Sequence, residues 1–273
     1  MGNWYGYNNF FLNFKNSTLK KLFIISLAGL FFYAPLQAQD STAKKPEIDP
    51  SKPTNLYTQV NTSLEYQAGK TQNLFGVRAN VQYALNPDNL FLVELPLLYN
   101  DRTEKFGVAD MRIRYYNAVK RNISKSFIAI VPFADISLPT GSYKNGLGGS
   151  SWSLAGGVVF GFIATKKLSL FPGISYVHIT KPGTDLIPAA SKFSSNGIGL
   201  QFNASLGFNK STFMFINPTP TFLNTNGNWK SIWSGEFNLN KIITPGKFKM
   251  NIGWGPNFTY DVHTLKLGCT FYL

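Results

Sequence analysis

The chain has 273 residues and a formal net charge of +13, and only 14% of its residues are charged while 15% are aromatic. The high apolar and aromatic content excludes intrinsic disorder, and the single cysteine, Cys269, excludes a disulfide scaffold or a cysteine-based structural zinc site. A helical membrane bundle would need several apolar runs of about 20 residues. The remaining class is a β-rich chain with finely interleaved apolar and polar residues.

The N-terminal segment has the order of a secretory signal peptide. Three lysines and no acidic residue precede or flank the apolar run at 22–36, and the small residue Ala38 follows it. We expect cleavage after Ala38, so that residues 1–38 are removed; an uncleaved anchor is the alternative. Residues 39–54 are polar and proline-rich, which is typical of a flexible segment, here expected in the periplasm.

From about residue 55 the sequence alternates with a period of two. In the last segment, HTLKLGCTFYL at 263–273, every second residue is apolar, and the residues between them are mostly threonine, lysine or glycine. Side chains alternate across a strand, so one face of each strand is apolar and the other polar. A soluble β-sandwich also alternates, and it remains the alternative fold.

Strand number and loop length favour a membrane barrel. An even number of strands, with short turns at one end and longer loops near 141–149 and 181–194 at the other, is typical of bacterial outer-membrane barrels. The chain ends inside a strand, so strand twelve can pair with strand one and leave no edge facing lipid. We predict an all-β fold, a closed up-and-down antiparallel transmembrane β-barrel over 55–273. Its twelve expected strands are 55–68, 72–86, 89–100, 105–119, 126–139, 150–165, 168–180, 195–209, 211–223, 230–243, 247–260 and 263–273.

Charged residues fix which face of each strand points inward. A lysine or arginine on the lipid face near the bilayer midplane costs roughly 2–4 kcal/mol, so charged positions within strands are assigned to the lumen. Mixed signs are expected either from a salt-bridge network that packs a narrow interior or from a polar pathway, and both interpretations stay open. The predicted lumen-lining residues are Arg78, Glu94, Asp110, Arg112, Arg114, Asp135, Glu236, Lys249 and Lys266.

We find no catalytic constellation in the sequence. The two histidines, His178 and His263, lie far apart, which gives no metal-ligand spacing. No cofactor is implied. Removal of the signal peptide would leave a net charge of +10, but these charges are spread over turns and lumen positions. They fit anionic lipid headgroups better than nucleic acid.

Two short motifs resemble a known family. The stretch from Phe106 to Asp110, in which Gly107 and Asp110 precede a strand, is similar to a "G-x-G-D" element, and Leu138-Pro139-Thr140-Gly141-Ser142 is similar to an "L-P-T-G" element. The chain thereby resembles the outer-membrane barrels labelled MetA-pathway of phenol degradation, usually called transporters. The resemblance implies a barrel that passes small, often hydrophobic, compounds. Pro139, Thr140 and Gly141 are expected to end strand five at the rim, and Asp110 to point into the barrel.

The sequence therefore predicts an integral protein of the bacterial outer membrane that is a passive channel or transporter for small molecules, and not an enzyme. The alternatives are a non-conducting structural or adhesive barrel and a lipid-modifying enzyme. The expected partners are outer-membrane lipids and lipopolysaccharide, the barrel-assembly machinery acting through the C-terminal strand, and a small solute of unknown identity. No nucleic acid is expected.

Overall fold

The computed structural model describes residues 49–52 and 54–273. The predicted signal peptide, and the segment that follows it up to residue 48, lie outside the described residues. Those described belong to one compact unit. Within them, no helix is long and apolar enough to span a bilayer.

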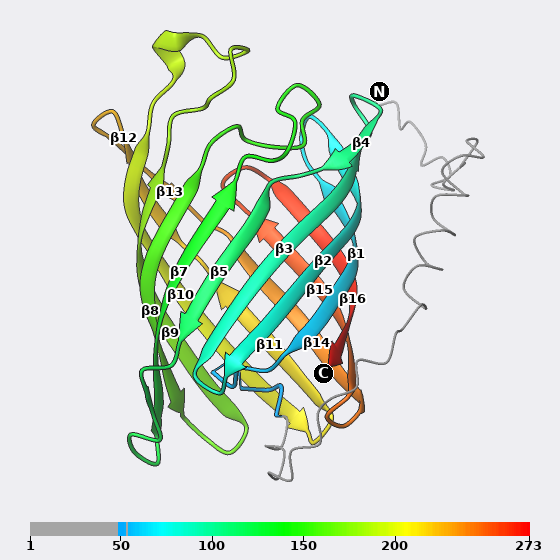
Figure 1. The fold of residues 1–273 in the computed structure, drawn as a ribbon, viewed down its shortest axis with the longest axis vertical. Helices are drawn as coiled ribbons and strands as arrows, with labels where there is room; N and C mark the ends of the chain where they lie inside the picture. Colours follow the sequence, from blue (N-terminus) through cyan, green and yellow to red (C-terminus); the bar gives the residue numbers. More distant parts are fainter. Residues whose placement is uncertain (1–48, 53) are drawn as a thin grey trace, which may run out of the picture. The chain divides into compact units, whose positions relative to one another are not determined.

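Sixteen antiparallel strands form one continuous sheet that closes on itself (Figure 1). The strands and a short 3₁₀ helix of the described residues are β1 (Gln59–Ala68), β2 (Asn73–Asn86), β3 (Asn89–Asn100), β4 (Lys105–Val108), β5 (Met111–Asn117), β6 (Lys120–Arg121), β7 (Phe127–Leu138), β8 (Ser153–Ile163), β9 (Leu168–Ile179), η1 (Ala189–Ser191), β10 (Ser195–Asn209), β11 (Thr212–Pro218), β12 (Thr221–Thr225), β13 (Asn228–Ile232), β14 (Gly235–Thr244), β15 (Phe248–Asn257) and β16 (Val262–Tyr272).

The sixteen strands occupy twelve strand positions around the barrel, because some positions hold more than one short strand. This confirms the predicted fold. Three of these positions are interrupted. Strands β4, β5 and β6 share the fourth position, β11 and β12 share the ninth, and β13 and β14 share the tenth. The barrel closes where β1 pairs with β16, from Gln59 opposite Tyr272 to Ala68 opposite His263. Because the first and last strands pair with each other, the sheet has no unpaired edge.

The two ends of the barrel differ in their connections. We call the end where β1 begins and β16 ends the terminal end; Figure 1 marks it with the C label. Its turns are short, such as 210–211 between β10 and β11 and 245–247 between β14 and β15. The opposite end, the loop end, carries the long connections 139–152 and 180–194.

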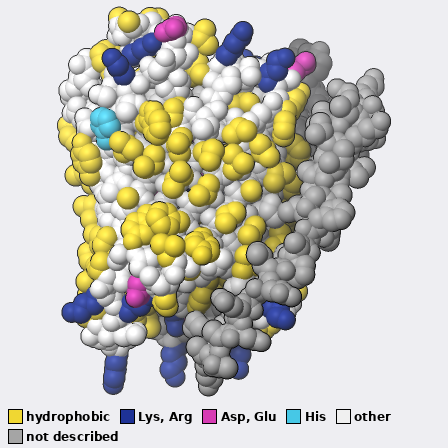
Figure 2. All heavy atoms as spheres, viewed as in Figure 1, with side chains coloured by type: hydrophobic (Ala, Val, Ile, Leu, Met, Phe, Trp, Pro, Cys, Tyr) yellow, Lys and Arg dark blue, Asp and Glu magenta, His cyan; other side chains and the backbone are white. Residues whose placement is uncertain are grey.

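The outer wall is apolar, and the inner wall is mostly polar with apolar side chains in places. On β16, Leu265 and Leu267 are 56% and 52% exposed on the outside, whereas Lys266 between them lines the interior. Figure 2 shows the outside of one face of the barrel, where apolar side chains cover the middle and lysines and arginines lie at both ends. This is the reverse of a soluble sandwich, which buries the apolar face of its sheets between two layers.

Two prolines interrupt the ninth strand position of the barrel, because proline cannot donate a backbone hydrogen bond to the ladder. β11 ends at Pro218 and β12 begins at Thr221, after Pro220. The register against β10 is nevertheless the same on both sides of the break, with Ala204 opposite Ile216 and Gly199 opposite Thr221. The prolines therefore remove donors from the ladder without inserting or deleting a residue.

Candidate channel lumen

The barrel encloses a cavity of about 900 Å³ that is lined by inward side chains from strands around the wall. Much of its lining is uncharged and polar, with amide side chains on one strand after another. The lining amides include Asn61, Asn80, Gln82, Gln201, Asn203, Asn217, Asn238, Asn240 and Asn251. Such side chains both donate and accept hydrogen bonds, so this wall is compatible with water and with polar solutes.

An arginine and two glutamates form the first ionic cluster in the lumen. Arg78 on β2 donates from Nε and Nη2 to the two carboxylate oxygens of Glu65 on β1, at 2.7 and 2.8 Å. Its Nη1 donates to Glu94 Oε1 on β3 at 2.6 Å. The Glu65 side chain is only 1% exposed. An ionised carboxylate buried to this degree is stable only because the bidentate contact with Arg78 compensates its lost hydration.

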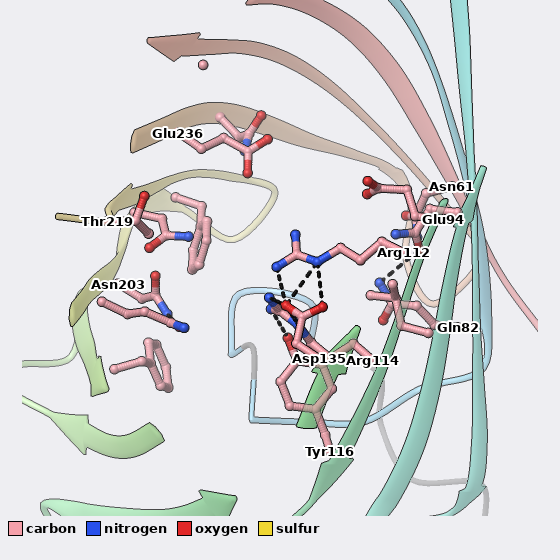
Figure 3. A pocket seen from close by; sticks show the side chains of 18 of the residues that line it. Asn61, Gln82, Glu94, Arg112, Arg114, Tyr116, Asp135, Asn203, Thr219 and Glu236 are labelled. Atoms are coloured by element: carbon pink, nitrogen blue, oxygen red, sulfur yellow. Dashed lines mark hydrogen bonds and ion pairs between the residues drawn. The ribbon is translucent and has the colours of Figure 1, made fainter. Parts of the chain in front are cut away.

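The second ionic cluster contains two arginines and one carboxylate, whereas the first contains one arginine and two carboxylates. Arg112 and Arg114 on β5 both bind the carboxylate of Asp135 on β7, and the Nε atoms of both arginines lie 2.9 Å from its oxygens. Arg114 Nη1 also donates to the hydroxyl of Tyr116 at 2.7 Å. Figure 3 shows the two guanidinium groups converging on Asp135.

The two clusters are neighbours on the wall, because Glu94 lies opposite Arg112 in the pairing of β3 with β5. Together they contain three arginines and three carboxylates and are neutral as a set. Lys266 on β16 lies opposite Glu65 in the pairing of β1 with β16, and it forms an ion pair with Glu236 on β14 at 2.9 Å. The middle of the lumen therefore carries many charges but little net charge.

Lys249, near the terminal end, differs from the other charged lining residues. It is the second residue of β15 and lines the cavity. Its Nζ lies 5.6 Å from the centre of the Phe213 ring. Within the described residues, it is the one charged residue of the cavity lining that forms no ion pair.

The loop end is narrowed by loop 139–152, which is held by Asp110. Asp110 Oδ1 accepts a hydrogen bond from the Gly141 backbone N–H at 2.9 Å, and Oδ2 accepts one from Gly149 N–H at 2.8 Å. A Cβ atom on Gly141 would lie 2.3 Å from the Leu147 carbonyl oxygen, so this close approach requires glycine. One carboxylate thus fixes both ends of the turn.

The same loop packs against the inside of the barrel. Leu147 is 5% exposed and forms an apolar cluster with Leu74 and Leu98, which share the inward face of β2 and β3 with Arg78 and Glu94. Asn100, fully buried, donates from Nδ2 to the Asn145 carbonyl at 2.9 Å. The loop therefore extends into the mouth of the lumen.

The terminal end is narrowed by the residues that precede β1. Thr54 is 4% exposed, and Leu56 packs against Ala129 and Val131 on the inner wall. Arg121 donates to the Thr54 carbonyl at 2.8 Å and to Asp88 at 2.6 Å, so it ties this segment to the adjacent turn. Thr54, the last residue of the segment 39–54 that the sequence predicts to be flexible, is therefore bound to the barrel.

Hydrogen bonding within this segment keeps Asp49 ionised. Burial acts to raise the pKa of its carboxyl, but hydrogen bonds from the hydroxyl and backbone N–H of Ser51, together with Lys52, outweigh burial and lower the pKa below its ordinary value. The Ser51 hydroxyl donates to Asp49 Oδ1 at 2.6 Å, and the Asp49 backbone N–H donates to the Tyr57 hydroxyl at 2.9 Å.

The structure brings eight of the nine predicted lumen residues to the cavity wall. The exception is Asp110, which binds the backbone of loop 139–152 instead, because that loop covers it. The motif residues are placed close together: Thr140 Oγ1 donates to the Ala109 carbonyl at 2.8 Å and accepts from Met111 N–H at 2.9 Å. β7 ends at Leu138, directly before Pro139, and Gly107 lies beside Leu147.

Two lumen residues, Glu65 and Tyr272, are absent from the set predicted from the sequence. The alternation of Val60, Leu64 and Tyr66 puts Glu65 on the inward face of β1, so the sequence contained the signal for it. Tyr272 lines the cavity, where its ring meets that of Tyr57 edge-on at 6.2 Å. Its position follows the inward parity of Lys266.

The two histidines are separate from each other in the structure as well. His178 Nδ1 lies 2.7 Å from Asn196 Oδ1, and His263 Nε2 lies 3.3 Å from Asp261 Oδ1. Both contacts are exposed. Within the described residues, no group of three or more histidine, cysteine, aspartate or glutamate side chains is arranged to hold a metal ion.

No family model matches this sequence, and no curated protein matches it. Solved structures do match the fold. The COG4313 outer membrane channel from Pseudomonas putida F1 is 14% identical with a TM-score of 0.56, over 83% of this chain and 100% of that one. The NanC porin is 14% identical with a TM-score of 0.57, over 78% and 100%. The KdgM porin in complex with disordered oligogalacturonate is 12% identical with a TM-score of 0.51, over 79% and 99%. The chain thus has the fold of outer-membrane channels and porins.

Proposed function

We propose that this protein is a passive channel for small molecules in the bacterial outer membrane. The observation that carries the proposal is the polar cavity of about 900 Å³ inside a closed barrel whose outer wall is apolar. A barrel with an apolar exterior is stable in a bilayer. A lumen lined by amides and charges favours hydrated passage over a dry core.

Membrane insertion would follow from the same division of the wall. Exposed residues such as Val81 and Ile252 would contact acyl chains, and the lysines and arginines at the two ends would meet lipid headgroups and lipopolysaccharide. The proposal includes export and removal of residues 1–38. It also includes assembly by the barrel-assembly machinery through β16, which closes the sheet by pairing with β1.

We further propose membership in the MetA-pathway of phenol degradation family of barrels. The two motifs that carry this resemblance, around Gly107–Asp110 and Pro139–Gly141, are joined by the hydrogen bonds of Asp110 and Thr140. These hydrogen bonds between the two motifs give a physical reason for both motifs to occur in one chain. Small hydrophobic compounds are then one class of solute to test.

A non-enzymatic role is part of the same proposal. A lipid-modifying enzyme that hydrolyses its substrate through a covalent intermediate would need a nucleophile beside a general base. His178 contacts Asn196 on the outer face, and His263 contacts Asp261 in an exposed turn. Neither contact supplies a serine or cysteine nucleophile.

Conductance in planar bilayers tests the channel. The wild-type protein should give discrete current steps, and Asn80→Trp, which places a large ring in the lumen, should reduce their size. Val81→Trp is the matched control, because Val81 is the next residue on β2 and is 48% exposed on the outer face. Folded protein that gives no steps above a protein-free membrane would exclude the channel.

The narrowed mouths support one competing proposal, a non-conducting structural barrel. Loop 139–152 and the segment before β1 both reach the lumen. The same recordings distinguish the two, because a sealed barrel gives no current whichever face carries the tryptophan.

A further inference from the structure

We propose that Lys249 makes the lumen selective for anions and binds the carboxylate of a small organic anion with an apolar body. This inference rests on the proposed channel function. It concerns which solutes the channel favours, so the two can fail separately.

Among the described residues, the charges of the lumen leave Lys249 without an ion-pair partner. Arg78 is bound by two carboxylates, Arg112 and Arg114 share one, and Lys266 is paired with Glu236. Lys52, at the terminal mouth, is paired with Asp49 at 3.2 Å. Each of these groups has its charge largely compensated within the wall. Lys249 is the charged lining residue for which the described chain supplies no carboxylate.

The position of Lys249 separates it from the ionic clusters. It lies opposite Thr270 on β16 and opposite Ile242 on β14, close to the turn 245–247 at the terminal end. The nearest inward neighbour on its own strand is Asn251, which is neutral. A solute at this point meets one positive charge without a nearby negative partner.

The contact with Phe213 does not replace a counter-ion. A cation over an aromatic ring gains about 0.5–2 kcal/mol, and the ring brings no net charge. An ammonium group in a wall of low dielectric retains a strong attraction for an anion, because surrounding water screens it less. Rings of lysine or arginine select anions in other pores by this effect.

The neighbourhood also defines the solute. Phe213, beside the ammonium, is only 4% exposed, whereas Phe215, two residues further along β11, is half-buried and offers its ring to the same cavity. An apolar surface next to a lone positive charge complements a molecule with a carboxylate at one end and an apolar body at the other. The chemical class is a small organic monocarboxylate.

Reversal potentials in a KCl gradient test the selectivity. Wild-type protein should favour chloride over potassium. Lys249→Gln should lower the chloride-to-potassium permeability ratio at least about twofold, because it removes the local potential, and Lys249→Glu should lower it further. Lys241→Gln is the matched control, since Lys241 is exposed near the same end and binds the Ser211 hydroxyl at 2.9 Å.

The outcomes are distinct. If Lys249→Gln conducts and keeps the wild-type permeability ratio, the inference is wrong while the channel stands. If the folded wild-type protein does not conduct, the proposed function fails. Heat-modifiable migration in gels establishes that each variant is folded before it is recorded.

A second measurement tests the binding of the carboxylate. Potassium hexanoate added to the KCl solution should reduce the chloride current through wild-type protein more than through Lys249→Gln. Hexanamide, which has the same apolar body without the charge, should have little effect on either protein. Equal reduction by hexanoate in both proteins would overturn the binding role of Lys249.

Discussion

Asp110 and Gly149 are joined by a hydrogen bond of 2.8 Å from the glycine N–H to the carboxylate, across thirty-nine positions of sequence. The other carboxylate oxygen holds Gly141 at 2.9 Å. The loop that narrows the lumen thus depends on one acidic side chain at the start of β5. Hydrogen bonds to a charged group contribute about 1.5–3 kcal/mol each, so this attachment is strong enough to hold a loop.

Asp110→Ala should therefore free loop 139–152. We expect larger conductance steps and faster tryptic cleavage at Lys144, which is exposed within the loop. Asp101→Ala is the control, because Asp101 is exposed at the same end and accepts a hydrogen bond from the Asn73 backbone N–H instead. Unchanged conductance and unchanged cleavage in Asp110→Ala would contradict a restraining role.

Arg78→Gln should destabilise the barrel strongly. The change leaves Glu65, whose side chain is 1% exposed, without its cation, and breaking a buried ion pair from one side costs about 3–5 kcal/mol. The denaturant midpoint of the folded barrel measures this loss. Arg102→Gln, in an exposed turn, should leave the midpoint unchanged.

A compensating variant separates charge from packing in this cluster. Glu65→Gln and Glu94→Gln added to Arg78→Gln remove both unpaired carboxylates, and the triple variant should regain much of the lost stability. If the triple variant is as unstable as Arg78→Gln alone, packing of the arginine side chain rather than charge is the cause.

Arg121→Ala should loosen the terminal mouth. It removes the hydrogen bonds to the Thr54 carbonyl and to Asp88, so the segment before β1 loses its tie to the turn. Single-channel records should show more frequent transitions to a larger conductance. Lys120→Ala, at an exposed neighbouring position, is the control. Identical current records from the two variants would show that Arg121 does not restrain the segment before β1.

Leu267→Arg tests the lipid-facing wall directly. Leu267 is 52% exposed in the middle of β16, and arginine near the bilayer midplane costs about 2–4 kcal/mol. Folding into lipid vesicles should be destabilised by this amount. Gln201→Arg places the same side chain in the lumen and should cost less; equal costs would argue against the assignment of faces.

The period-two pattern accounts for what the sequence predicted. Alternation is local, since neighbouring residues in a strand point to opposite faces whatever their strand pairs with. It therefore defined the strands, and the charge at Asp135 or Lys266 was enough to orient them. The break between β11 and β12 at Pro218 and Pro220 has an equally local cause, because proline has no N–H to donate.

Partnership among side chains depended on the tertiary structure. Whether Arg112 and Arg114 share Asp135, or Lys249 is left without a carboxylate, follows from register and closure, which pair residues far apart in the chain. The inward loop at Asp110 and the tie from Arg121 to Thr54 arise in the same way. The sequence by itself determined most of the charged side chains that enter the lumen; only the closed barrel decided which of them neutralise one another and which remain free to meet a solute.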